Sequence, residues 1–145
     1  MYNRLCLNLN IRTTLLTARN MDHYQFESIV IKTIEALPEE FREKLENVDV
    51  VVEDWPSVEQ LRRLKIRNRS QLLGLYEGIP HIQRGRGYGM VLPDKITIFK
   101  RPIEMRCRSD KEIETEIGNV VRHEIAHHFG TDENTLREIE EKYRK

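Results

Sequence analysis

Long apolar runs and an excess of one charge are both absent from this chain of 145 residues. No stretch approaches the ~20 consecutive apolar residues that a membrane-spanning helix requires, so we expect no membrane partner. Lysine and arginine together number 24, as do aspartate and glutamate together. Proteins that bind nucleic acid through its phosphates usually carry a basic excess, so this balance argues against a general nucleic-acid-binding protein.

Cysteine is also scarce, since the chain contains only Cys6 and Cys107. They form no Cys-x-x-Cys pair, and two cysteines do not provide the disulfide framework that small secreted domains use. The composition therefore favours a reduced, cytoplasmic protein. The length indicates one domain, and a 39% share of apolar residues is enough for a small core.

Residues 1–20 contain three arginines and no acidic residue. They lack the periodic apolar face that a packed helix would show. We expect this segment to be a poorly ordered N-terminal extension that folding does not require. The single domain then covers residues 21–145.

A His-Glu-x-x-His sequence lies near the C-terminus, from His123 to His127. Positions four apart lie on nearly the same side of a helix, so these two imidazoles can bind one ion from consecutive turns. Glu124 stands next to the first histidine, where its carboxylate can reach a water molecule bound to the ion. These residue types at this spacing are typical of zinc metallopeptidases, in which the glutamate is the general base.

The motif can work only on a helix, and the flanking sequence predicts one from about Asp110 to Phe129. Ser109 and Glu112 have the spacing of a capping box at its start. Gly130 can end it in a left-handed conformation. Apolar residues recur between these signals at helical spacing: Ile113, Ile117, Val120, Val121 and Ile125.

The rest of the chain predicts an α+β fold with a mixed sheet of three or four strands and the motif helix packed across one face. The expected helices cover about Asp22–Ala36, Glu39–Glu46, a segment capped by Ser57 and ending near Leu64, and a last helix containing Leu136, Ile139 and Tyr143. The expected strands are Val48–Glu53, Leu72–Glu77 and Lys95–Lys100, the second of them in an interior position because its start has few polar residues. Gly74 in that strand suggests a bulge or a close approach of another element.

Residues 62–69 are rich in arginine and lysine. Such a segment can bind nucleic acid when aromatic residues alternate with the basic ones and stack on bases. No aromatic residue occurs in this segment, so we interpret it as a solvated charged surface.

The motif and its surroundings resemble the small zincin-like metallopeptidases, whose minimal fold is similar to that of matrix metalloproteases. Their pattern is His-Glu-x-x-His-His-Phe-Gly followed by an acidic metal ligand, and residues 123–130 match it letter by letter. The resemblance covers the chain from about Met21 to its end. One departure is that metzincins carry a methionine turn after the third ligand, whereas no methionine follows residue 130 here. Met90 and Met105 are the nearest alternatives.

The resemblance implies a Zn²⁺ ion bound by His123, His127 and an acidic residue. Glu133 matches the position of that third ligand, and Asp132, one residue earlier, remains the alternative. His128 is out of phase with the two ligands, so we expect it on the surface or beside the site, where its ring could orient Glu133 or a substrate. Tyr143 could stabilise an oxyanion, although core packing is the simpler role for it.

Three functions fit these observations. The first is zinc-dependent hydrolysis of peptide bonds by metal-activated water, with Glu124 as the general base and a peptide or protein as the substrate. The second is a metal-binding domain without peptidase activity. The third is a regulatory protease that acts on one specific partner protein.

The third ligand can be tested by replacing each acidic residue in turn. Glu133→Ala should lower zinc affinity by orders of magnitude, because the longer side chain can reach back to the ion after the turn. Asp132→Ala should mainly cost ~1 kcal/mol of helix-cap stability. Titration of both variants against a zinc chelator measures the difference. If Asp132→Ala loses the metal and Glu133→Ala keeps it, the ligand is one residue earlier.

Overall fold

The computed structural model describes residues 21–78, 94–128, 134, 135, 137, 138 and 141. Several predicted features lie outside the described residues: the extension over residues 1–20, both candidate third ligands (Asp132 and Glu133), and the apolar residues of the last helix. The description below concerns the remaining chain.

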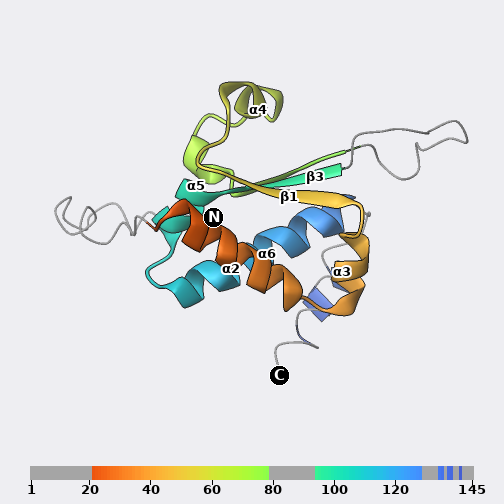
Figure 1. Cartoon of the computed structure of the whole chain (residues 1–145). Coiled ribbons are helices and arrows are strands. Elements are labelled where there is room, and N and C mark those ends of the chain that lie inside the picture. The colour runs from red at the N-terminus through yellow and green to blue at the C-terminus, as the bar shows by residue number, and fades with distance from the viewer. Residues whose placement is uncertain (1–20, 79–93, 129–133, 136, 139–140, 142–145) are drawn as a thin grey trace, which may run out of the picture.

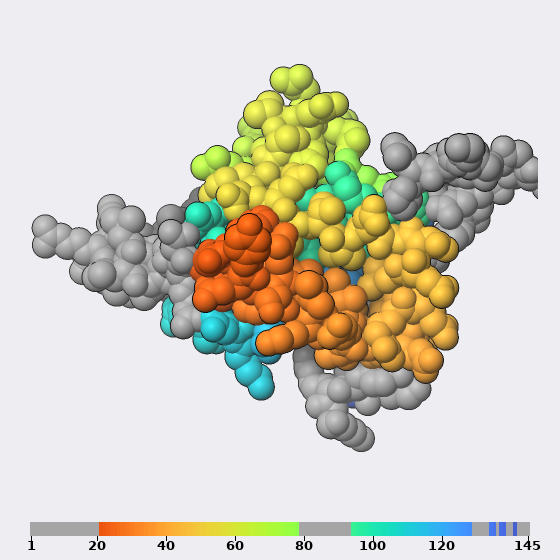
Figure 2. Space-filling model, viewed as in Figure 1, coloured from red at the N-terminus to blue at the C-terminus, as the bar shows by residue number. Residues whose placement is uncertain are grey.

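The described chain alternates helices and strands. The helices are α2 (His23–Glu35), α3 (Glu39–Lys44), α4 (Val58–Arg63), α5 (Lys100–Arg106) and α6 (Asp110–His128), with a short 3₁₀ turn η2 (Arg69–Gln71). The strands are β1 (Val48–Glu53), β2 (Gly74–Glu77) and β3 (Asp94–Phe99). Helices α2 and α6 lie below the sheet, and α4 projects above it (Figure 1). In the same view, α2 and α3 form much of the near surface (Figure 2). None of the described helices is long and apolar enough to cross a membrane.

The three strands form one mixed sheet in the order β1-β3-β2. Strand β3 is parallel to β1 and antiparallel to β2, which confirms the predicted mixed sheet of an α+β fold. The interior position predicted for Leu72–Glu77 is wrong, because β2 lies at one edge of the sheet formed by the described residues. The apolar start that suggested burial lies before the strand, where Leu72 and Leu73 are only partly buried. The central strand is β3, whose inner residues are covered on both faces.

Helix boundaries follow the local sequence closely. Ser57 and Gln60 exchange both hydrogen bonds of a capping box at the start of α4. At the start of α6, the Ser109 hydroxyl accepts a hydrogen bond from the backbone N–H of Glu112. Helix α5 was not predicted; it begins at Lys100, where the third strand was expected to end, and it carries Pro102 in its first turn. Proline is tolerated in a first helical turn, where its missing N–H would have no helical partner.

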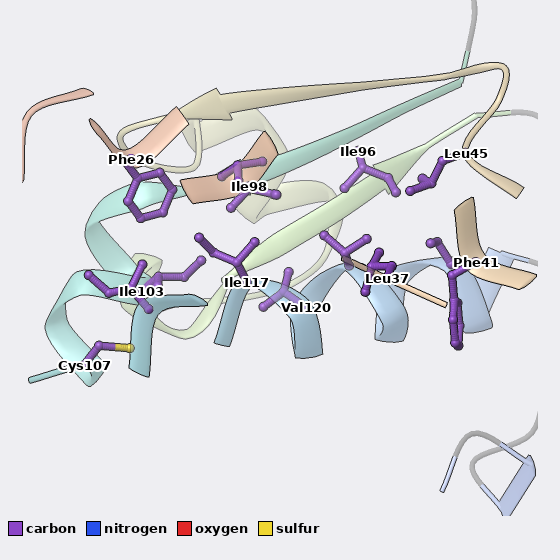
Figure 3. Close-up of a cluster of buried hydrophobic side chains, with 14 residues drawn as sticks. Phe26, Leu37, Phe41, Leu45, Ile96, Ile98, Ile103, Cys107, Ile117 and Val120 are labelled. Carbon is purple, nitrogen blue, oxygen red and sulfur yellow. The ribbon is translucent and has the colours of Figure 1, made fainter. Parts of the chain in front are cut away.

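The core lies between the sheet and helices α2 and α6. Ile117 and Val120 of α6 point toward Ile96 and Ile98 of β3 (Figure 3). The α6 side chains buried in this core include all five apolar residues that predicted the helix. Truncating a large residue in such a core typically costs ~2–5 kcal/mol, so this packing fixes the position of the helix that carries the motif.

A buried ion pair stabilises α5. Lys100 Nζ lies 2.9 Å from Glu104 Oε1, and these side chains are only 2% and 3% exposed. The same carboxylate accepts a hydrogen bond from the backbone N–H of Met21 at 3.0 Å, and Arg101 Nη1 lies 3.4 Å from its other oxygen. Glu104 thus joins α5 to the chain that leads into α2.

We predict that Glu104→Leu alone will lower the free energy of unfolding by ~3–5 kcal/mol, because it leaves the Lys100 ammonium buried without its carboxylate. The double variant Lys100→Met/Glu104→Leu removes both charges and should lose clearly less. Urea unfolding of the three proteins measures the difference. Equal losses in the single and double variants would contradict a buried, coupled pair.

Candidate metal centre

His123 and His127 lie on the last two turns of α6, as the sequence predicts. Both residues are exposed. Their ring centroids are 4.2 Å apart, with an angle of 46° between the ring planes. Two accessible imidazoles this close together on one side of a helix can contribute nitrogen ligands to a single ion.

The donor set fits zinc as far as the described residues extend. Imidazole nitrogen is a common zinc ligand, and a catalytic site adds a third protein ligand and leaves one position open. Within the described ranges, no third His, Cys, Asp or Glu completes a metal-binding group. The predicted third ligands, Asp132 and Glu133, both lie outside those ranges.

Glu124 is held in place by the edge strand. Its Oε2 accepts a hydrogen bond of 3.1 Å from the backbone N–H of Tyr76 in β2. Burial raises the pKa of the Glu124 carboxyl, while the Tyr76 hydrogen bond and the nearby His123 and His127 partly oppose that shift. A raised pKa makes this carboxylate a better proton acceptor than an exposed glutamate.

The close approach of β2 to α6 depends on Gly74. A Cβ atom at this position would lie only 2.4 Å from Val120 Cγ1 and 3.6 Å from Glu124 Cγ. No real side chain can occupy that space without moving its neighbours. The sequence predicted a bulge or a close approach at Gly74, and the structure shows the close approach.

The His128 side chain is buried beside the site, so of the two predicted positions the surface one is wrong. Its side chain is only 6% exposed, and its Nε2 lies 3.5 Å from Asp94 Oδ2. The ring stacks on that of Tyr76, with 3.8 Å between centroids and an interplanar angle of 12°. The Tyr76 hydroxyl in turn donates a hydrogen bond to Asp94 Oδ2 at 2.9 Å. The cluster of Tyr76, Asp94 and His128 therefore ties the end of α6 to β2 and β3.

Sequence reasoning missed Tyr76 and Asp94 because they lie far from the motif along the chain. Tyr76 is 48 residues from Glu124, and no motif spacing relates the two. The one local signal was Gly74, which marked where β2 and α6 meet.

Met105, a candidate for a floor below the metal, is 62% exposed on α5. Met90 and Tyr143 lie outside the described residues.

A cleft opens beside the motif. Its volume is roughly 500 Å³, and its lining combines polar residues of α6 with apolar residues of β2 and of the connection that precedes it. The lining residues are Leu64, Ile66, Leu72, Gly74, Leu75, Tyr76, Gly78, Glu124, His127 and His128. A group bound in this cleft would lie next to Glu124 and His127.

Comparison with known protein families agrees with this geometry. The family model for zincin-like metallopeptidases matches residues 45–143, about two thirds of the chain. The chain belongs to this family. Comparison with curated proteins found no match. Membership confirms the zincin-like α+β fold and implies a metal cofactor, typically zinc. The match starts at Leu45 rather than near Met21, so α2 and α3 of this zincin-like metallopeptidase lie outside it, although both pack on the core.

We predict that Gly74→Ala will destabilise the protein by ~1–3 kcal/mol, because the new methyl group overlaps Val120. Val120→Ala alone should also destabilise it by creating a cavity. In the double variant the smaller alanine side chain at position 120 makes room for the methyl group. The loss in the double variant should therefore be smaller than the sum of the two single losses by ~0.5–3 kcal/mol. Denaturant unfolding of all four proteins measures this coupling, and additive losses would contradict the contact.

Proposed function

We propose that this zincin-like metallopeptidase hydrolyses peptide bonds in a peptide or protein substrate, with Glu124 as the general base. The observation that carries the proposal is the backbone hydrogen bond from Tyr76, which fixes the Glu124 carboxylate in the cleft that His127 also lines. His123 and His127 would hold the zinc ion together with an acidic third ligand. We assign that ligand to Glu133, with Asp132 as the alternative.

When bound, zinc would supply a Lewis acid that lowers the pKa of a water molecule and polarises a carbonyl group. The work of the protein is to place a proton acceptor beside that water. The Tyr76 N–H bonds to Oε2 of Glu124, and we assign the proton to the other carboxylate oxygen, Oε1. Glu124 can then return this proton to the leaving amine nitrogen.

The raised pKa of Glu124 suits both proton transfers, since a general base is most effective when its pKa is near the working pH. Burial, the main cause of the raised pKa, also limits the number of water molecules that compete for the carboxylate. The Tyr76–Asp94–His128 cluster would support this role indirectly, because it holds the strand that donates to Glu124 against the end of α6.

We also propose that the protein works in a reducing, cytoplasmic environment. Cys107 is a free thiol buried in the core. Burial, with help from Glu116 and Glu112, raises its pKa to about 11, so the thiol is protonated and unreactive near neutral pH. This chemistry fits a structural cysteine rather than a disulfide partner or a nucleophile.

Glu124→Gln should abolish peptide hydrolysis and preserve both the fold and the bound metal. The amide is nearly isosteric and can still accept the Tyr76 hydrogen bond, but it cannot take a proton from water. Elemental analysis of tag-free protein should find about one zinc per chain in wild type and variant, and a peptide-library cleavage assay should find activity only in the wild type.

Glu114→Gln is the matched control, since Glu114 is an exposed glutamate of the same helix. This control should keep full activity. Near wild-type cleavage by Glu124→Gln would refute the general-base role, and metal content below a tenth of an equivalent in carefully handled wild-type protein would refute the metal site.

A further inference from the structure

The basic segment over residues 62–69 carries five arginine or lysine residues and no acidic residue. Two of its cations have partners. Arg63 forms an ion pair with Glu77, a contact that together with Lys95 lowers the pKa of Glu77. The Arg69 guanidinium lies 3.9 Å above the ring of Trp55.

The other three cations, Arg62, Lys65 and Arg67, are exposed. The described residues give none of them an ion pair, and the one acid on α4 is the exposed Glu59. The segment therefore keeps an excess of positive charge even after Glu59 is counted.

The three cations are close in the chain to two residues that line the cleft, although none of them lines it itself. Leu64 and Ile66 line the cleft, and Lys65 lies between them in the chain. Leu72 and Leu75 continue the apolar lining toward the motif. Glu77 is already neutralised by Arg63 and Lys95. Part of the apolar lining of the cleft therefore belongs to the same chain segment as the three exposed cations.

Lys65 adopts an unusual backbone conformation between Leu64 and Ile66. Its φ is 56°, the left-handed region that favours glycine. Helix α4 ends there in a Schellman motif, in which the N–H of Ile66 bonds to the carbonyl of Leu61 and the N–H of Lys65 to that of Arg62. Glycine is the usual residue at this position. A lysine here carries backbone strain and places a cation beside the cleft instead.

The geometry points to substrates in which an apolar side chain is flanked by aspartate or glutamate. The apolar residue would occupy the lining formed by Leu64, Ile66 and Leu72, and the flanking carboxylates would lie near Arg62, Lys65 and Arg67. This inference rests on the proposed peptidase function and names the substrate class of the same cleft. Charge complementarity of this kind raises the association rate and excludes basic competitors.

Single-stranded nucleic acid is the competing anionic ligand, and the structure favours it less. Nucleic-acid grooves combine cations with aromatic rings on which bases stack. The ring that contacts this segment is Trp55, and Arg69 already covers it. The cleft also contains the rings of Tyr76 and His128, but these stack on each other, and the lining residues next to the cations in the chain, Leu64 and Ile66, are aliphatic.

The test uses the full chain loaded with zinc and carrying Glu124→Gln, so that binding is measured without cleavage. The probes are three fluorescein-labelled pools of short peptides with a fixed leucine, flanked by glutamate, glutamine or lysine. The glutamate pool should bind about tenfold more tightly than the glutamine pool, and the lysine pool should bind most weakly. This preference should shrink as salt is added.

Charge variants locate the effect. Arg62→Gln/Lys65→Gln/Arg67→Gln should remove the preference for glutamate. The control Lys32→Gln/Arg42→Gln/Lys111→Gln removes the same charge from exposed residues of α2, α3 and α6 that do not line the cleft, and it should keep the preference.

Lys65→Gly separates binding from folding. Glycine fits the left-handed backbone, so this variant should melt at a higher temperature, yet it should bind the glutamate pool about two- to fivefold more weakly. Unchanged affinity in this variant would overturn the assignment of Lys65.

Equal binding of the three pools, or no binding, would overturn the inference, as would tighter binding of a labelled single-stranded oligonucleotide than of the glutamate pool.

Cleavage of the same pools by the wild-type protein distinguishes failure of the acidic preference from failure of the proposed peptidase function. Cleavage of all pools alike leaves the peptidase function intact and refutes the acidic preference. Charge-dependent binding without cleavage of any pool supports the acidic preference and refutes the peptidase function.

Discussion

The contact between strand β2 and helix α6 is the constraint on which the candidate site depends. Gly74 lets the strand lie against the helix at a distance that no side chain would permit. At that distance the Tyr76 N–H reaches Glu124, and the Tyr76 ring reaches His128. One glycine thus allows the contact through which the Glu124 carboxylate is held in place.

The sheet and the core hold that contact in place. Strand β2 pairs only four residues with β3, and a strand this short has little stability of its own. The long helix supplies the missing rigidity, because its apolar face is buried under the sheet along most of its length. Asp94, at the start of β3, then joins both elements by bonding to Tyr76 and lying close to His128. Catalytic geometry is usually built this way, from side chains whose positions are fixed by packing around them.

The same arrangement explains why one end of the cleft is polar and the other apolar. The polar end is the last two turns of α6, where the motif leaves the core. The apolar end comes from the connection between β1 and β2, which carries α4 and the basic segment above the sheet (Figure 1). Because the two ends belong to different parts of the chain, the residues near the motif and the apolar lining can be substituted independently.

The sequence by itself determined the motif helix, because capping and apolar spacing are local properties of the chain, and α6 starts at Asp110 as those signals predict. It also determined β1 to the residue and the mixed α+β class. Only the tertiary structure decided that β2 is an edge strand, that α5 forms, and that Tyr76, Asp94 and His128 meet beside Glu124. The reason is that side-chain types and spacings reveal what a segment does within a few turns, whereas contacts across tens of residues depend on how the finished elements pack.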